Sequence, residues 1–144
     1  MDYRALTAAI IAQRMGLEEQ AAEGSLDGTK AVACEVLFTP WAAGPYNVGD
    51  VCRHGGQIWR CCQAHDSTSQ AGWEPGAAAA LWSPYHTVDV RYAKAFIQPT
   101  GAHDTYQSGE VCRWEGAIYR SKVDNNAYSP IDYPDNWEIV EQSF

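Results

Sequence analysis

Cysteine and histidine residues occur close together in the sequence at two places in the first half of the chain. Cys52 is followed by His54 two residues later, and the adjacent Cys61 and Cys62 are followed by His65. Thiolates and imidazoles are the ligands of Cys₂His₂ zinc sites, and a thiol beside a histidine is also the arrangement of a cysteine nucleophile. Whether either chemistry is available depends on the elements that hold these side chains.

The cysteines belong to a segment that occurs twice. Tyr46–Arg60 reads YNVGDVCRHGGQIWR, and Tyr106–Arg120 reads YQSGEVCRWEGAIYR, at an offset of 60 positions and without a gap. After each copy a proline stands seven residues before a tryptophan, at 75–82 and 130–137. The chain therefore contains two copies of one small module.

Each copy is expected to form a β-hairpin. In copy one the predicted strands are Val51–Arg53 and Ile58–Cys62, joined by a tight turn at residues 54–56 where glycine accommodates positive φ. Strand alternation then separates two sets of side chains. The predicted core set is apolar and aromatic: Cys52, His54, Trp59 and Cys61, with Cys112, Trp114, Tyr119 and Ser121 in copy two. The predicted opposite set is Arg53, Ile58 and Arg60, with Arg113, Ile118 and Arg120 in copy two.

This pattern argues against a metal site. It places Cys62 on the opposite face from Cys52 and Cys61, whereas zinc ligands must converge. Copy two should fold in the same way, yet it has Ser121, Lys122 and no matching histidine. We therefore predict thiols, no metal ion and no cofactor.

Enzyme chemistry is also poorly supported. A cysteine nucleophile would need a histidine beside it and an orienting group, and nothing in the sequence determines that geometry. Carboxylate pairs for glycoside hydrolysis can be assembled from Asp50, Asp66 or Glu74, but any acidic chain offers as many. Asp50 and Glu110 follow a glycine at a strand entry and are predicted to be turn residues. We expect no enzymatic activity.

Composition restricts the classes of partner. The 144 residues include 10 Lys and Arg against 18 Asp and Glu, a formal net charge of −8. This balance argues against nucleic acid and anionic membranes, which select clustered basic residues. No apolar run approaches the ~20 residues of a membrane span, and we expect no signal peptide because a basic region followed by an apolar core is missing. Five cysteines, an odd number, fit a reduced cytoplasmic chain.

Residues 1 to about 23 are predicted to form a helix, because Ala, Leu, Glu and Gln are frequent and Pro is absent. Gly16 and Gly24 are the candidate stops. One apolar stripe and a second apolar side are expected: Tyr3, Leu6, Ile10, Leu17 and Ala21, then Ile11 and Met15. The helix either packs on its own repeats or self-associates or docks onto a larger assembly, since small repeats offer little surface to cover it.

Three connecting segments are less regular. Residues 24–30 are expected to be a loop, and residues 31–38 a strand or a buried connector. Residues 88–92, VDVRY, alternate and are a candidate strand between the copies.

Trp41 through Trp82 resembles the chitin-binding modules of bacterial chitinases, carbohydrate-binding module families 5 and 12. The shared pattern comprises Trp41, Tyr46, Gly49-Asp50, Cys52, Gly56, Trp59 and Trp82. The loop CQAHDSTSQAGWEPGAAAALW is similar to the Cys-x-x-His … Ala-Gly-Trp-Glu-Pro … Leu-Trp segment of those modules. Copy two looks like related modules of bacteriophage structural proteins, so the resemblance spans roughly residues 38–140.

The resemblance implies a compact twisted antiparallel sheet with an aromatic core and no catalytic activity. It also implies that Trp73, in the Ala-Gly-Trp-Glu-Pro segment, stacks on sugar, and that His65 and Pro75 lie near the binding surface. Tyr128 stands at the matching distance before Pro130 in copy two. A flat indole on a loop suits the C–H face of a pyranose, although a loop tryptophan can equally fold back onto the core. The other tryptophans are assigned mainly to the core, and residue 41 is expected either there or half-exposed.

We therefore predict a mainly β fold: an N-terminal α-helical arm followed by two small twisted antiparallel β modules. The predicted divisions are a helical arm for oligomerisation or docking at 1–30, module 1 at 38–86, a linker at 87–95 and module 2 at 96–143. The predicted function is non-catalytic carbohydrate binding by a homo-oligomeric phage or prophage virion component that adheres to glycans and contacts capsid or tail proteins. The alternatives are an assembly or decoration protein whose modules contact protein, and a zinc-dependent module.

Overall fold

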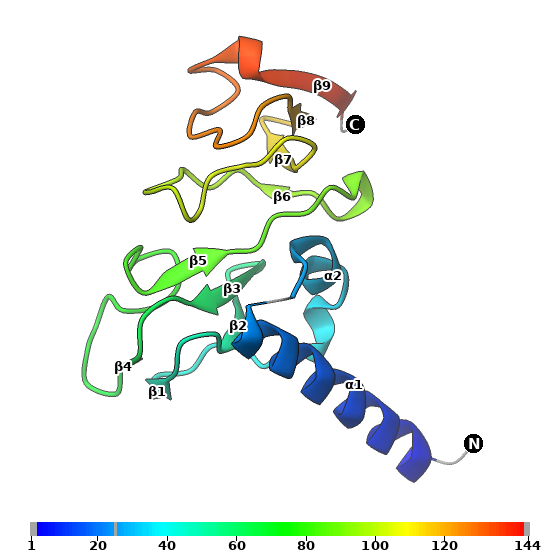
Figure 1. The fold of residues 1–144 in the computed structure, drawn as a ribbon, viewed down its shortest axis with the longest axis vertical. Helices are drawn as coiled ribbons and strands as arrows, with labels where there is room; N and C mark the ends of the chain where they lie inside the picture. The colour runs from blue at the N-terminus through cyan, green and yellow to red at the C-terminus, as the bar shows by residue number, and fades with distance from the viewer. Residues whose placement is uncertain (1–2, 25, 143–144) are drawn as a thin grey trace. The chain divides into compact units, whose positions relative to one another are not determined.

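The computed structural model describes residues 3–24 and 26–142. Two short helices precede a series of short strands and loops, which confirms the predicted fold class (Figure 1). The chain divides into two compact units. The first unit comprises Met1–Asp27 and Cys34–Ser83, and the second comprises Gly28–Ala33 and Pro84–Phe144.

Helix α1 spans Tyr3–Glu23. It runs through Gly16 and ends before Gly24, whose φ of 78° lies in the left-handed region that glycine favours. The backbone N–H of Gly24 donates to Ala21 O at 3.1 Å and closes the last turn. Of the two predicted stops, the later one is correct.

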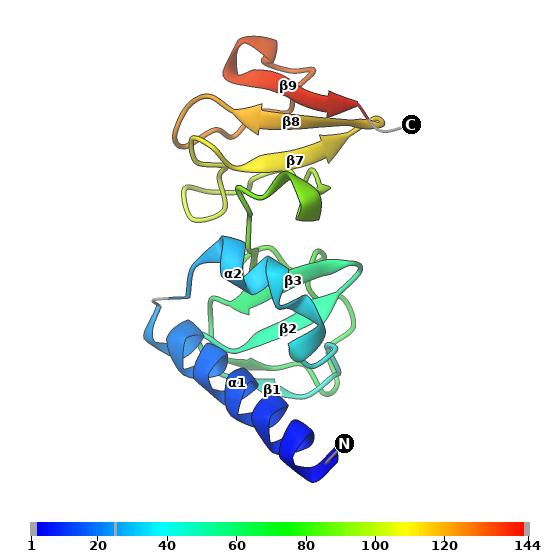
Figure 2. The same cartoon turned by 90° about the vertical axis from the view of Figure 1, so that its right-hand side faces the viewer.

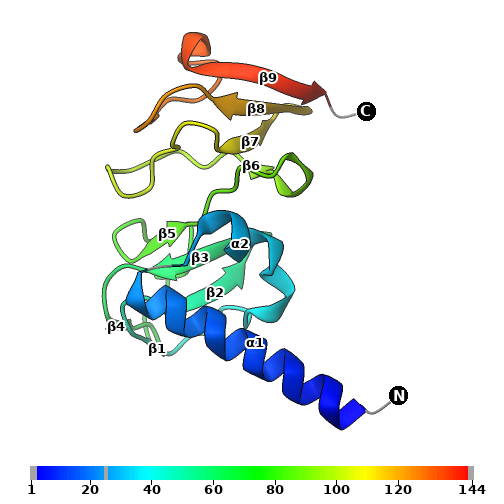
Figure 3. The same cartoon turned by 45° about the vertical axis from the view of Figure 1, so that its right-hand side comes forward.

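The C-terminal half of α1 packs on its own module. Leu17 and Ala21 are buried, and an added Cβ at Gly49 would lie 2.7 Å from the Cα of Ala22. Ile10 and Met15 remain 44% and 56% exposed. The N-terminal part of the helix extends past the sheet (Figure 3). Among the described side chains of the predicted stripe, Leu17 and Ala21 are buried and Ile10 is largely exposed. Tyr3, Leu6 and Ile11 lie outside the residues whose side chains are described.

The first unit contains the predicted hairpin. Strands β2 (Val51–His54) and β3 (Gln57–Cys61) pair antiparallel with Cys52 opposite Trp59, and β5 (Trp82–Pro84) lies on the other side of β3. The turn glycines 55 and 56 have φ of 60° and 75°, as a two-residue hairpin turn requires. A second antiparallel pair joins β1 (Pro45–Tyr46) to β4 (His65–Asp66).

The predicted division into a core face and an outer face is wrong at one residue. Cys52 and Trp59 are buried as expected, but Ile58, assigned to the opposite face, is also 0% exposed. Arg53 lies opposite Ile58 in the hairpin, and its Nε donates to the carbonyl of buried Phe38 at 2.9 Å. The Arg53 side chain thus reaches the segment before the module, and Ile58 is buried on a face that alternation alone assigns to solvent.

The second unit repeats the hairpin. Its sheet has the order β6 (Lys94–Ala95), β7 (Val111–Trp114), β8 (Ala117–Ser121) and β9 (Trp137–Gln142). Figure 2 shows β7, β8 and β9 side by side. Strands β7, β8 and β9 are antiparallel, whereas β6 runs parallel to β7. Cys112 lies opposite Tyr119, as Cys52 lies opposite Trp59. The core of this unit contains Tyr106, Cys112 and Trp137.

The connecting segments differ from their predictions. Helix α2 (Gly28–Ala33) begins inside the expected loop, and Glu35–Leu37 forms a 3-10 helix instead of a strand. Ala31, Val32 and Phe38 are buried, whereas Val36 is 83% exposed, so the segment is a connector that is buried only in part.

The candidate strand at residues 88–92 is also wrong. Val90–Tyr92 forms a 3-10 helix, because the Asp89 carboxylate accepts the Arg91 N–H at 3.0 Å. This local hydrogen bond competes with extended pairing. Within residues 87–95, which were predicted as a linker, Thr87 bridges to Val111 in the second unit.

Candidate functional site

Four aromatic rings meet at one end of the first unit. His65 on β4 stacks on Tyr46 of β1 with centroids 5.8 Å apart, and meets Trp82 edge to face at 5.4 Å. The ring of Trp73 makes an edge contact with His65 at 6.0 Å. His65 thus connects the loop tryptophan to the buried core, which Trp82 belongs to.

A hydrogen bond to the backbone holds the His65 ring in one orientation. Its Nδ1 lies 2.7 Å from Gln63 O, and because a carbonyl only accepts, Nδ1 carries the hydrogen. Its Nε2 is buried and has no hydrogen-bond partner among the described residues. The His65 ring contacts the Trp73 ring through an aromatic edge contact rather than through a hydrogen bond.

The backbone of the Trp73 loop is anchored. The indole Nε1 of Trp82 donates to Trp73 O at 3.0 Å, and Gly72 has a φ of 86°, which turns the chain just before the tryptophan. Trp73 is half-buried, so part of its indole is open to solvent, while Pro75 is buried. The structure therefore brings Trp73 and His65 together and gives Pro75 a supporting position inside the loop.

Tyr128 occupies the corresponding backbone position in the second unit. Its carbonyl accepts the indole Nε1–H of Trp137 at 2.9 Å, as Trp73 O accepts that of Trp82. The Tyr128 side chain is 54% exposed. Its ring lies 5.5 Å from that of Tyr133, a residue that the sequence analysis did not identify. Tyr133 could have been found in the sequence because it is a second aromatic residue in the same polar loop as Tyr128.

Burial shifts the pKa values of two thiols in the first hairpin. Cys61 Sγ lies 3.7 Å from His65 Nδ1, but burial raises the pKa of the Cys61 thiol. Burial likewise raises the pKa of Cys52 to about 12, so both groups are poor thiolates. None of the five cysteines, all of which lie in the described ranges, forms a disulfide bond. In the described part of the chain, no three His, Cys, Asp or Glu residues are placed to share a metal ion.

Two acidic residues of the repeat serve the turns. Asp50 Oδ2 accepts the Asn47 N–H at 2.7 Å, and Glu110 Oε1 accepts the Gln107 N–H at 2.6 Å. Their prediction as turn residues is confirmed.

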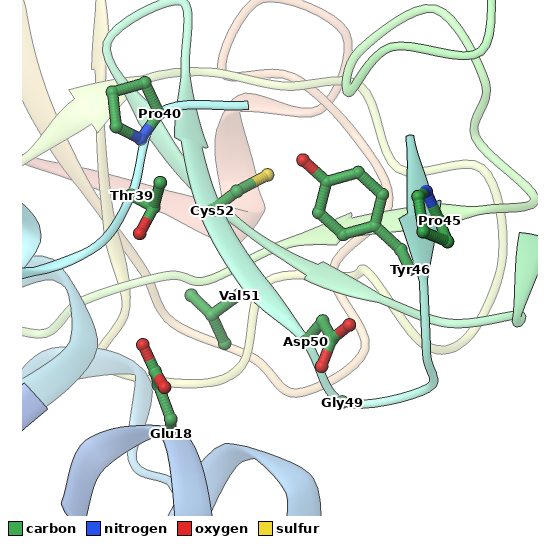
Figure 4. A pocket seen from close by; sticks show the side chains of 9 residues that line it. All are labelled: Glu18, Thr39, Pro40, Pro45, Tyr46, Gly49, Asp50, Val51 and Cys52. Carbon is green, nitrogen blue, oxygen red and sulfur yellow. The ribbon is translucent and has the colours of Figure 1, made fainter. Parts of the chain in front are cut away.

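Two pockets lie in the first unit, in addition to the aromatic cluster. One, of about 250 Å³, forms where Glu18 of α1 faces Thr39, Asp50 and Val51 of the module (Figure 4). The other, of about 420 Å³, is lined by half-buried Trp41 and by the hairpin turn. None of the predicted sugar-binding residues lines either pocket.

The tryptophan loop, its anchoring bond and the small twisted sheet agree with a match to a known family. Residues 40–83 match the model of carbohydrate-binding module family 5/12. This segment is similar to a carbohydrate-binding module. The match confirms the resemblance for copy one and indicates that this segment binds carbohydrate. It does not extend to copy two. No curated protein matches the chain.

The structure also bears on the expected absence of a membrane segment. None of the helices in the described ranges has the length and apolar character needed to span a bilayer.

Proposed function

We propose that this protein binds chitin or a related glycan through the family 5/12 module, with Trp73 as the principal contact. The observation that carries the proposal is the partly exposed indole of Trp73 on an anchored loop, inside the segment that matches the family. His65 contributes by supporting the ring, and Pro75 by shaping the loop.

The chemistry of a pyranose suits this surface. Its axial C–H bonds form an apolar face, which packs on an indole, while its hydroxyls remain at the edge in water. The loop is held by the Trp82 hydrogen bond before the ligand arrives, so that little conformational entropy is lost on binding. A single ring contact is weak, and a second binding surface in the same chain would raise the apparent affinity through effective concentration.

The test is retention on insoluble chitin, cellulose and peptidoglycan. Wild type should bind at least one matrix, and Trp73→Ala should weaken that binding by about tenfold or more, as for a central aromatic contact. Tyr92→Ala is a suitable control, because Tyr92 is 44% exposed and lies in the other unit. Passage of wild type through all three matrices would contradict the proposal.

We further propose that the protein is a homo-oligomeric virion component of a phage or prophage, made in the cytoplasm, that lets the particle adhere to cell-surface or environmental glycans. The support for oligomerisation is α1, which leaves Ile10 and Met15 in solvent while Leu17 and Ala21 pack on the module. Ile10→Glu combined with Met15→Glu should reduce the mass measured by light scattering to that of a monomer.

The virion setting has its own test. Peptides of this protein should be found by mass spectrometry in purified particles of the source phage or prophage. Purified particles that lack the protein, while the infected cell contains it, would contradict this part of the proposal.

An assembly or decoration role is the second candidate, and one feature of the second unit favours it. A pocket of about 350 Å³ on that unit has Trp114, Tyr119, Ile131 and Ile139 among its lining residues. Ile131 is 65% exposed. Such a surface suits an apolar side chain of a capsid or tail protein. Ile131→Asp should then abolish incorporation into particles while glycan binding by Trp73 continues.

A further inference from the structure

We infer that the second unit carries its own saccharide-binding surface, formed by Tyr128 together with Tyr133, and that it takes neutral or amine-bearing sugars rather than acidic ones. This inference rests on the proposed function, because it assumes that the chain binds glycans. It adds Tyr133 and a charge selectivity, neither of which follows from the match to residues 40–83.

The two tyrosines differ from the core aromatic residues of the second unit. Tyr106 and Trp137 are buried in its core, whereas Tyr128 and Tyr133 are 54% and 48% exposed although their rings touch. The ring centroids are 5.5 Å apart and the ring planes are inclined by 32°. Two adjoining rings that each keep about half of their surface in solvent form a continuous aromatic surface larger than one side chain provides.

Hydrogen bonds fix the backbone beneath these rings. The Trp137 indole holds Tyr128 O at 2.9 Å, and buried Asn126 accepts the Tyr128 N–H through its side-chain oxygen at 3.2 Å. Tyr133 N donates to Ser129 O, and Asn136 N donates to Tyr133 O, both at 3.1 Å. The rings are therefore displayed on a pre-organised loop, which is the condition for efficient stacking on a ligand.

The charge along the segment that carries the two tyrosines favours one class of ligand. Asp132 and Asp135, both exposed, flank Tyr133. From residue 123 to the end of the chain there are five acidic residues and no lysine or arginine. Carboxylates accept hydrogen bonds from sugar hydroxyls and pair with a protonated amine, but they repel a uronic acid or a sulfated sugar. The matching ligand is a neutral hexose or N-acetylhexosamine chain, or its deacetylated form.

The experiment uses the full-length chain carrying Trp73→Ala, so that the first unit contributes little. Depletion isotherms on colloidal chitin should show residual binding by Trp73→Ala and a further loss of about tenfold when Tyr133→Ala is added. Adding Tyr133→Phe should preserve the residual binding because the ring remains, and adding Tyr92→Ala should leave it unchanged. Hydrogen–deuterium exchange on each variant checks that the second unit remains folded.

The outcomes separate the two proposals. If wild type binds none of chitin, cellulose and peptidoglycan, the proposed function fails and this inference fails with it. If wild type binds but Trp73→Ala alone removes all binding, or if adding Tyr133→Ala has no effect, only this inference is overturned. The selectivity is tested on the same Trp73→Ala chain, which should bind chitosan and fail to bind carboxymethylcellulose; the reverse preference would overturn the ligand class.

Discussion

The two units share a hairpin but present different surfaces. In each, a buried cysteine of the first strand lies opposite an aromatic residue of the second, Trp59 in one and Tyr119 in the other. In each, a core tryptophan donates its indole N–H to a loop carbonyl, at 3.0 Å and 2.9 Å. The hydrogen bond that anchors the loop is therefore the same in both copies, whereas the aromatic residue at the anchored position differs: Trp73 in the first and Tyr128 in the second.

The difference lies in the length and composition of the loop. The second loop is about five residues shorter and places two tyrosines in contact, whereas the first places a single tryptophan on a histidine. A repeated core can thus carry two binding surfaces of different character, because the hydrogen bond that anchors each loop involves only its backbone carbonyl.

The largest expected effect tests whether each anchoring tryptophan serves only its own unit. Trp82→Ala should destabilise the first unit by about 3–5 kcal/mol, and Trp137→Ala the second by a similar amount, because each removes a buried indole. Hydrogen–deuterium exchange should show lost protection in the altered unit alone. Loss of protection in both units in either variant would mean that the copies fold as one cooperative body.

Two matched glycines give the next effect. Gly49 and Gly109 have φ of 92° and 94°, so alanine should cost about 1–2 kcal/mol at each. At Gly49 the new Cβ would also lie 2.7 Å from Ala22 Cα, whereas at Gly109 the nearest atom is Val88 Cγ1 at 3.7 Å. Gly49→Ala should therefore be the more harmful by roughly a further 1–3 kcal/mol. Equal losses in urea unfolding would contradict the close packing of α1 on the first unit.

Acid should weaken the second unit through His86. The ring of His86 stacks on that of Tyr106 with the ring centroids 3.8 Å apart, and its Nε2 donates to Asp104 O at 3.1 Å. Loss of solvent around the ring lowers the pKa of His86 below its usual value, although Asp104 partly opposes this. The unfolded chain then takes up a proton at a higher pH than the folded chain does. The free energy of unfolding is therefore at its full value above about pH 6.5 and decreases as the pH falls below it. The total loss is about 1.4 kcal/mol for each unit by which the folded-state pKa of His86 is lowered.

Urea unfolding of the second unit between pH 7 and pH 5 measures this effect. His86→Phe keeps a ring against Tyr106 and removes the titration, so its stability should change less over this range. An unchanged slope in that variant would assign the acid sensitivity to another group.

The smallest effect should be equal in the two units. Asp50 and Glu110 each accept one turn N–H, at 2.7 Å and 2.6 Å. Asp50→Ala and Glu110→Ala should each cost about 1 kcal/mol, the usual contribution of one such hydrogen bond. A marked difference between the two in thermal unfolding would show that the turns, although similar in sequence, differ in their importance to the two hairpins.

Local interactions made much of this protein predictable from its sequence. The hairpin register follows from a two-residue side-chain period and a glycine turn, and the end of α1 follows from the left-handed backbone at Gly24. The turn carboxylates and the tryptophan loop were recognisable for the same reason, since each depends on residues near one another in the chain.

Only the tertiary structure decided which surfaces are covered. Ile58 is buried on a face that alternation assigns to solvent, and Pro75 is buried although it lies in a loop. Tyr133 joins Tyr128 because the short loop turns back through its hydrogen bond to Ser129. Burial and contact of this kind depend on segments that meet only after folding, and no local period in the sequence encodes them.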